Sequence, residues 1–261
     1  MKKILSLILA MLMIALAATA CSTPKDEDAD ETEPEETVEE KSPSEAYSEV
    51  KKFFDGLTEV VISGTITENK TVGTESEDTT YKTVANAKGI GTDGFKLSMD
   101  MNGIKAVYID GYSYINEPGG IKVKMQLMDG ELSRIFNVES FVNYDFEDYA
   151  SATVAREGEN TVLTLKGISK EQFAENHLGV TKDDFDTDEK YNEYVSTLEE
   201  DAKNYTETFT LDKNGTVTAF TMEYSYPDGE NTVVSYKEEN TVSTEAEDVA
   251  IPEDADEYLE F

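Results

Sequence analysis

The sequence predicts an α+β domain in which a large curved antiparallel sheet of about eleven strands, a half-barrel, wraps around helices. Stretches of alternating apolar and polar residues recur between turn signals such as Asp110-Gly111 through most of the chain from residue 58 onward. Helical spacing is confined to residues 43–57, 131–142 and 169–203. A twisted sheet of so many strands usually curls or closes, and the helices are the only cover available for its apolar face.

The domain opens with a predicted amphipathic helix. Ser42 is placed to cap its first turn, Pro43 suits that turn, and Glu45 completes a capping box. Gly56 provides a stop at the C-terminal end. The apolar residues that recur at helical spacing between these signals are Tyr47, Val50, Phe53, Phe54 and Leu57.

A meander of strands follows the helix. Its strands are predicted at residues 58–69, 79–89, 95–101, 104–109, 112–116 and 121–127. Apolar side chains alternate with polar ones, so each strand presents an apolar face and a polar face. The apolar residues of the third and sixth strands are Phe95, Leu97, Met99 and Met101, then Ile121, Val123 and Met125.

The second part of the domain mixes helices with strands. A helical patch at residues 131–142 precedes two strands, at about 147–156 and 161–167. A helical insertion is expected at about 169–203, with capping boxes formed by Ser169 with Gln172 and by Thr181 with Asp184. Closing strands are predicted at residues 205–211, 216–226 and 231–239.

The N-terminus has the pattern of an export signal. Lys2 and Lys3 precede an apolar run from Ile4 to Ala17, which is shorter than the roughly 20 residues that span a bilayer. The only cysteine, Cys21, follows small residues, and this order resembles the lipobox of bacterial lipoproteins. The resemblance implies a signal peptide at residues 1–20 and a lipid attached to Cys21. The alternative is an ordinary secretory signal with a chance cysteine.

An acidic segment follows the cysteine. Residues 26–40 contain ten Asp or Glu residues, and Val38 is their only sizeable apolar residue. Such a segment cannot bury enough surface to fold, so residues 21–41 are predicted to be the lipidated cysteine and a disordered tether for a domain at 42–261. A calcium-binding tail is the alternative. The formal charge of −34 for the whole chain excludes nucleic acid as a partner.

The order of elements behind a lipobox resembles the lipoprotein carriers of the LolA and LprG type, and more closely the uncharacterised Gram-positive surface lipoproteins with the same half-barrel. The stretch VYIDGYSYINEPGGIKVKMQL at residues 107–127 resembles their hairpin pair, and IPEDADEY at 251–258 resembles their usual ending. The insertion at 169–203 departs from the short connection expected there. The resemblance implies a half-barrel wrapped around helices with an apolar cavity for acyl chains.

A cavity of that kind would be lined by apolar residues of the strands and of the first helical patch. Methionine is an adaptable lining for a variable chain. A solid core would need the same side chains, so a filled core remains an equal alternative. The candidate lining residues are Phe95, Leu97, Met99, Met101, Ile121, Val123, Met125, Phe136, Phe220 and Met222.

The sequence carries no catalytic signature. His177, the only histidine, lies near the end of a short predicted helix, where a cation would be mildly favoured. No G-x-S-x-G elbow surrounds a serine, and no glycine-rich phosphate loop is present. The lack of tryptophan disfavours a glycosidase, and Arg134 and Arg156 have no context that would mark a phosphate site. No catalytic residue and no cofactor are predicted.

A calcium site in the insertion is also disfavoured. Residues 184–188 begin like an EF-hand loop, but Glu189 replaces the glycine at its sixth position and Val195 the glutamate at its twelfth. Acidic residues in the first turn of a helix explain the pattern without a metal. No metal ligand is predicted.

These patterns together predict a non-enzymatic, extracytoplasmic lipoprotein held at the membrane by a diacylglyceryl-cysteine and binding a lipid or another hydrophobic ligand. The alternative is a cell-surface sensor or interaction module that binds a protein partner with the same fold. The acidic, lysine-poor surface favours the outer face of a Gram-positive membrane, although Ser22 after the cysteine would also permit outer-membrane sorting in a Gram-negative cell.

Overall fold

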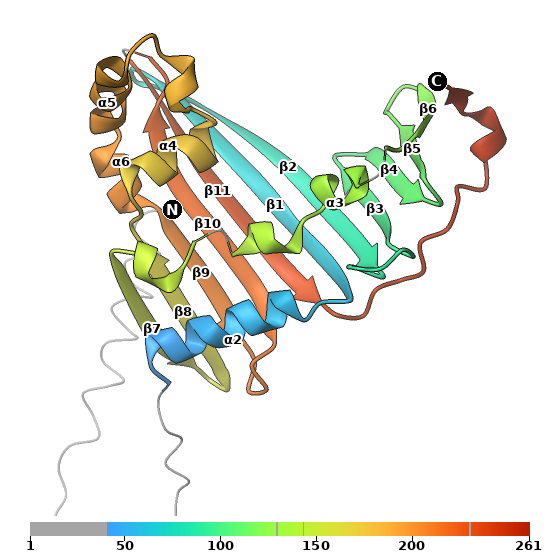
Figure 1. The fold of residues 1–261 in the computed structure, drawn as a ribbon, viewed down its shortest axis with the longest axis horizontal. Helices are drawn as coiled ribbons and strands as arrows, with labels where there is room; N and C mark the ends of the chain where they lie inside the picture. Colours follow the sequence, from blue (N-terminus) through green and yellow to red (C-terminus); the bar gives the residue numbers. More distant parts are fainter. Residues whose placement is uncertain (1–40, 129, 143, 230) are drawn as a thin grey trace, which may run out of the picture. The chain divides into compact units, whose positions relative to one another are not determined.

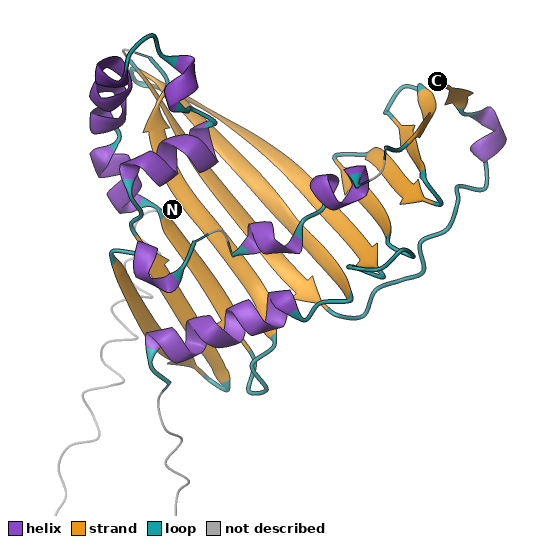
Figure 2. Ribbon diagram, viewed as in Figure 1, coloured by secondary structure: helices purple, strands orange, loops and turns teal. Residues whose placement is uncertain are grey.

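The computed structural model describes residues 41–261 except 129, 143 and 230. The predicted signal peptide, Cys21 and nearly all of the tether lie outside the described residues. The described chain forms one open sheet in the order β12-β6-β5-β4-β3-β2-β1-β11-β10-β9-β8-β7, with helices packed on it (Figures 1 and 2). The predicted α+β half-barrel is confirmed, with twelve strands instead of about eleven.

The first part of the chain forms the helix and the meander that were predicted. Its elements are α2 (Pro43–Asp55), β1 (Glu59–Val72), β2 (Glu75–Lys88), β3 (Lys96–Met101), β4 (Ile104–Ile109), β5 (Tyr112–Asn116) and β6 (Lys122–Gln126).

The second part contains the helical insertion and the closing strands. Its elements are α3 (Glu131–Ile135), η1 (Val138–Phe141), η2 (Phe146–Asp148), β7 (Ser151–Glu157), β8 (Asn160–Lys166), α4 (Lys170–Leu178), η3 (Lys182–Asp184), α5 (Asp188–Thr197), α6 (Glu199–Asn204), β9 (Thr206–Leu211), β10 (Val217–Pro227), β11 (Thr232–Ser243), η4 (Ala255–Glu257) and β12 (Leu259–Glu260).

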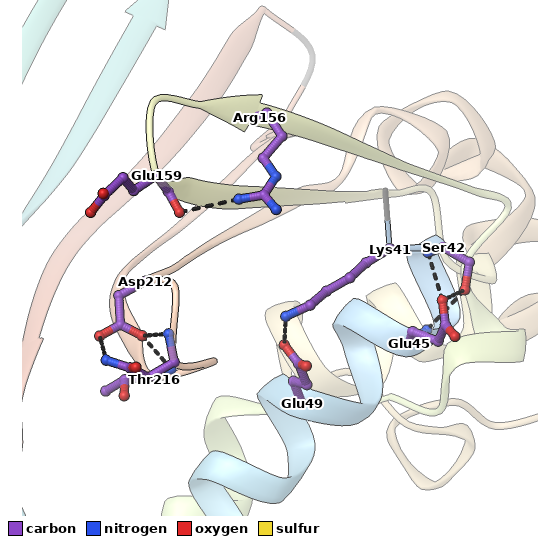
Figure 3. Close-up of polar contacts among 9 residues, drawn as sticks. Lys41, Ser42, Glu45, Glu49, Arg156, Glu159, Asp212 and Thr216 are labelled. Carbon is purple, nitrogen blue, oxygen red and sulfur yellow. Dashed lines mark hydrogen bonds and ion pairs between the residues drawn. The ribbon is translucent and has the colours of Figure 1, made fainter. Parts of the chain in front are cut away.

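Helix α2 begins as its sequence predicts. The Ser42 hydroxyl accepts a hydrogen bond from the Glu45 amide, and the Glu45 carboxylate accepts one from the Ser42 amide at 2.8 Å (Figure 3). Lys41 forms an ion pair with Glu49 one turn further along, at 2.5 Å (Figure 3). The two contacts between Ser42 and Glu45 satisfy amide groups that the start of the helix leaves without helical partners.

The predicted hairpins of the meander are confirmed. Asp110 and Gly111 both have positive φ, 52° and 80°, and connect β4 to β5 as a two-residue turn. Asn102 and Gly103, with φ of 52° and 89°, connect β3 to β4 in the same way. Two consecutive residues of positive φ match the twist of the flanking strands, and Asn-Gly and Asp-Gly are the pairs that adopt this conformation most easily.

Several elements differ from the prediction. Strand β2 begins at Glu75 rather than near residue 79, because the hairpin with β1 extends to Val72. The patch at 131–142 is not one helix: α3 ends at Ile135, Phe136 is extended, and η1 follows. The capping box of Thr181 and Asp184 opens only the short η3, and the next helix begins after Thr187.

The helices cover only part of the sheet. We call the face that they cover the inner face. The covered half consists of β7 to β11 and β1, on which Phe54 of α2 contacts Phe209 and Phe220, and Phe173 of α4 contacts Tyr224. The open half consists of β2 to β6, whose inner face has residues of the described segments 127–128 and 130–141 near it (Figure 1).

The outer face of the open half carries the end of the chain, residues 244–261, which we call the strap. The Asn86 amide group donates to the Glu247 carbonyl at 3.0 Å, and Tyr258 packs edge-on against Tyr114. The strap ends as β12, which pairs in parallel with β6. The sequence did not predict this twelfth strand.

Candidate functional site

The inner face of the open half carries no charged residue from Tyr81 of β2 through β6, and its charged residues, Glu75 and Glu77, lie at the far end of β2. We call the part from Tyr81 onward the uncharged face. Opposed residues of an antiparallel pair share a face, so the register assigns each side chain of β2 to β6. Charged residues make up 30% of the chain, and their absence from this face marks it as the candidate binding surface. Its residues are Tyr81, Thr83, Ala85, Ala87, Leu97, Met99, Met101, Ile104, Ala106, Tyr108, Ser113, Ile115, Val123 and Met125.

The opposite face of the same strands is basic. The same register places lysines along it, and the strap supplies carboxylates to several of them. From Tyr81 onward, the open half therefore has one uncharged face and one lysine-bearing face, as an amphipathic sheet does. The lysines are Lys82, Lys88, Lys96, Lys105, Lys122 and Lys124.

A pocket of about 250 Å³ lies where the uncharged face meets the segment at 135–141. Met99 and Met101 of β3 contribute to its wall, and the pocket is partly open to solvent at Met101, whose side chain is 42% exposed. Ile104, directly opposite Met101 on β4, is 43% exposed and continues the apolar surface. The lining residues are Ile62, Thr83, Val84, Ala85, Met99, Asp100, Met101, Ile135, Phe136, Asn137 and Phe141.

The structure divides the ten predicted lining residues into separate groups. Met99, Met101 and Phe136 line this pocket. Leu97 is fully buried beneath it, and Phe95 packs on Phe136 with ring centroids 6.2 Å apart.

The other five predicted residues lie elsewhere. Val123 and Met125 share the uncharged face but lie on β6, three strands from β3. Ile121 precedes β6 and is 58% exposed. Phe220 and Met222 belong to the covered half, where Phe220 packs against Phe54.

Sequence reasoning missed several apolar residues of this pocket. Ile62 and Ala85 are opposed on β1 and β2, and their strands were predicted without a role for either side chain. Ile135 and Phe141 were placed in a single helix, whereas the extended backbone at Phe136 turns the segment across the sheet. The alternation within each strand was the signal that could have found Ile62 and Ala85.

The covered half contains a buried carboxylate. Glu207 lies on the inner face of β9, between buried Phe209 and the chain turn at Tyr205, and only 5% of it is exposed. It accepts hydrogen bonds from the hydroxyl groups of Tyr149, at 2.5 Å, and Tyr205. Burial raises the pKa of Glu207 and of both tyrosines, and the carboxylate adds to the rise for the tyrosines.

His177 joins the same interior from α4. Its Nε2 atom lies 2.8 Å from the Tyr144 hydroxyl group, and its ring packs against Tyr205 and Tyr224 with centroids 4.6 and 4.9 Å apart. Burial lowers the pKa of His177 to about 4, so the imidazole is neutral near pH 7. Enclosure of the ring by aromatic side chains thus opposes the cation that the helix end alone would mildly favour.

The polar contacts of this interior are structural. Tyr47 of α2 donates to the Tyr144 carbonyl, and the Asn176 amide group donates to the Tyr144 hydroxyl group. The groups thereby join α2, the segment at 144–149, α4 and β9 through satisfied hydrogen bonds.

The acidic run at 184–188 makes local contacts. The Asp184 carboxylate accepts hydrogen bonds from the Thr181 amide, at 2.8 Å, and from its hydroxyl group, at 3.0 Å. Asp186 pairs with Lys190 at 2.7 Å. Across the part of the chain that the structure describes, no group of three or more His, Cys, Asp or Glu residues is arranged to hold a metal ion. Within the same part, no helix has the length and apolar character required to cross a bilayer.

No family model matches the chain, and no curated protein matches its sequence. Similar solved structures include a LolA superfamily protein from Nitrosomonas europaea, at 9% identity and a TM-score of 0.25, covering 80% of this chain and 96% of that one. A putative outer membrane lipoprotein-sorting protein domain from Vibrio parahaemolyticus matches at 9% identity and a TM-score of 0.26, covering 75% and 89%.

A DUF1329 family protein from Desulfovibrio piger is similar at 10% identity and a TM-score of 0.25, covering 81% of this chain and 96% of that one. At TM-scores of this size the likeness decides nothing about function. The function has to be inferred from the residues of this chain.

Proposed function

We propose that this protein binds a hydrophobic ligand, such as the acyl chain of a lipid, on the inner face of the open half, and that it does so without catalysis. The observation that carries the proposal is the uncharged face, which runs from Tyr81 of β2 to β6 in a chain in which charged residues make up 30%. Contiguous apolar surface that remains exposed on a folded domain usually marks a binding site.

The pocket supplies the starting point for such a ligand. Its volume of about 250 Å³ is close to the lower end of the range of roughly 300–1,000 Å³ typical of small-molecule sites. Each methylene group moved from water to apolar surroundings contributes about 0.8 kcal/mol. A chain that starts beside Met99 and continues over Met101 and Ile104 would keep adding such contacts beyond the pocket itself.

The side chains of this surface suit a ligand of variable shape. Met99 and Met101 are flexible and polarisable, so they can repack around different chains. Phe136 and Phe141 offer rigid rings on the opposite wall, 5.9 Å apart between centroids. Thr83 places a hydroxyl group at the same pocket, where a polar end of the ligand could bind.

Binding can be tested with the full chain. Lipids extracted from the natively purified protein would be identified by mass spectrometry, and the affinity for a fluorescent fatty acid would be measured. Met101→Lys should weaken that affinity at least tenfold, because a charge on the uncharged face has no partner when the ligand covers it. The matched control is Val233→Lys, because Val233 is 47% exposed on the outer face of β11.

Two outcomes would refute the proposal that the uncharged face binds a hydrophobic ligand. One is equal weakening of the affinity by Met101→Lys and Val233→Lys, and the other is no binding together with no extracted lipid. A core filled without a ligand would then be the better description. The affinity of Val233→Lys should equal that of the unchanged protein.

The proposal includes attachment of the protein to a membrane through Cys21, on the outer face of a Gram-positive cell. Support comes from the charged start, the short apolar run and the small residues before the cysteine. Cys21→Ser should release the protein from the membrane fraction, and the mass of the unchanged protein should include a diacylglyceryl group. An unmodified cysteine in membrane-extracted protein would contradict the anchor without affecting the ligand proposal.

A further inference from the structure

Strand β2 is much longer than the strand beside it. Along its whole length, from Glu75 to Lys88, β2 pairs with β1. Its other neighbour, β3, pairs only with Thr83 to Lys88. Residues 75–82 of β2 therefore form a second strand edge within the sheet, at which no strand of the described chain is paired.

The backbone of this edge presents unused hydrogen-bonding groups. The Lys82 amide donates to the Asn102 side-chain oxygen at 2.7 Å, and the Lys82 carbonyl accepts from the Asn102 amide at 3.0 Å, so both groups of Lys82 point away from β1. Backbone direction alternates along a strand. The amide and carbonyl groups of Ser76, Asp78 and Thr80 therefore point the same way, past the end of β3.

The edge is held in strand conformation before anything binds. Strand β1 continues to Val72 and pairs with β11 on its other side, so a third strand supports the hairpin. The Asn69 amide group donates to the Ser76 hydroxyl group at 2.7 Å and to the Asp78 carboxylate at 2.5 Å. A preformed edge avoids most of the ordering cost that a flexible segment would meet on binding.

The side chains of the edge are exposed, and all of its charged residues except Lys82 are acidic. Glu75, Glu77 and Asp78 form no ion pair with any lysine or arginine of the described chain, and every residue from 75 to 82 is exposed. Like charges would oppose pairing of this edge with the same edge of a second copy. The same charges attract lysine and arginine.

We propose that residues 75–82 of β2 bind an extended basic segment of a partner protein by strand addition. Backbone hydrogen bonds to Ser76, Asp78 and Thr80 would hold the segment in line with β3. Its lysines or arginines would lie against the three carboxylates. The ligand-binding proposal is not needed for this inference, although Thr83 and Met101, the first pair beyond the edge, line the pocket.

The test uses the full chain and a labelled peptide in which lysine alternates with threonine. Fluorescence anisotropy at low ionic strength should show saturable binding. The same peptide with alternate amides N-methylated keeps its charge but loses the donors for one strand edge, and its affinity should be at least tenfold lower. Amide exchange followed by NMR should slow at Ser76, Asp78 and Thr80 when the unmethylated peptide binds.

A matched pair of variants separates backbone pairing from charge. Thr80→Pro removes an amide that points away from β1, so the hairpin is retained, and it should weaken binding at least tenfold. Thr80→Val alters the same side chain but keeps the amide, and its affinity should stay within about twofold of the unchanged protein. Both variants lose the weak contact with the Thr67 hydroxyl group.

Equal affinity for the two peptides, or binding without slower exchange at the three amides, would overturn strand addition. If the peptide showed no saturable binding to the unchanged protein, the proposal that this edge binds a basic segment would be overturned. Exchange that slows at the three amides while Thr80→Pro binds normally would also contradict the role assigned to the Thr80 amide.

Discussion

The covered half and the open half belong to one sheet but are completed by different means. Helices close the inner face of the covered half with aromatic rings, and Phe54 alone contacts Phe141, Phe209 and Phe220 within 6.3 Å. The open half keeps its inner face partly exposed and carries the acidic strap on its outer face. Apolar burial closes the inner face of the covered half, whereas surface ion pairs hold the strap on the outer face of the open half.

The difference separates stability from binding. Apolar contacts in a closed core add up to most of the folding free energy of a domain, whereas exposed ion pairs contribute little. A surface that is to bind a ligand must stay accessible, so it cannot be the main source of stability. The covered half can hold the fold while β2 to β6 remain available.

The largest expected effect tests this division directly. Phe54→Ala removes a ring that is 1% exposed and touches both helix and sheet, so we expect a loss of about 3–5 kcal/mol in the free energy of unfolding. Met101→Ala, on the exposed surface of the open half, should change it by about 0.5 kcal/mol or less. Urea unfolding measures both, and similar losses would show that the halves do not differ.

The second prediction concerns pH and the interior of the covered half. The unfolded chain protonates His177 near pH 6.5, whereas the folded chain does so only near pH 4. The depressed pKa therefore contributes stability that is fully present above pH 6.5 and is lost as the pH falls towards 4. The contribution amounts to roughly 3 kcal/mol at 1.36 kcal/mol per pKa unit.

His177→Phe isolates that contribution. The substitution keeps a ring against Tyr205 and Tyr224 but removes the titrating group and its contact with the Tyr144 hydroxyl group. The free energy of unfolding of the variant should depend less on pH between 6.5 and 4 than that of the unchanged protein. Parallel pH dependences would mean that folding does not lower the pKa of the imidazole.

The third prediction concerns the pairing of β1 with β11, within the covered half and one strand from its boundary with the open half. Gly64 lies in the middle of β1, and a Cβ atom there would come within 2.2 Å of the Asn240 side-chain oxygen and 2.3 Å of the Glu239 carbonyl oxygen. Gly64→Ala should therefore cost about 1–3 kcal/mol through forced displacement of β11. Thermal unfolding measures the cost, with Ser63→Ala as the neighbouring control. An unchanged midpoint for Gly64→Ala would show that β11 can move away from β1 at Gly64 without loss of stability.

Sequence patterns predicted the local features of both halves. Capping boxes located the starts of α2 and α4, and Asp110-Gly111 located a hairpin to the residue. These features depend on residues within a few positions of one another, so a single sequence contains the needed information.

Long-range features were not predictable in the same way. Nothing near Lys122 in the sequence indicates that Asp254 and Glu257 will reach it, and nothing near Glu207 indicates that Tyr149 will cover it. The candidate pocket combines a locally predictable part with a part that depends on long-range contacts. The alternation of β3 indicated Met99 and Met101, but the wall formed by Ile135 and Phe141 depends on how the chain crosses the sheet.

The smallest expected effect on the free energy of unfolding concerns the open half, at the ion pairs between Lys122 and the strap. Lys122 forms ion pairs with Asp254, at 2.5 Å, and with Glu257, and hydrogen bonding to these carboxylates raises its pKa. Lys122→Gln removes both ion pairs. We expect the global free energy of unfolding to stay nearly constant while the end of the strap opens more often, because surface pairs of this kind hold local structure rather than the core.

Amide exchange at Phe261 reports that opening, because its amide donates to the Lys124 carbonyl at 3.0 Å. Exchange there should be faster in Lys122→Gln, and added salt should accelerate it in the unchanged protein by screening the same charges. Lys82→Gln is the control, since Lys82 lies on the same face but forms no ion pair with a carboxylate of the described chain. If Lys122→Gln lowered the unfolding free energy as much as Phe54→Ala, the strap would be part of the core, and the distinction between the two halves would fail.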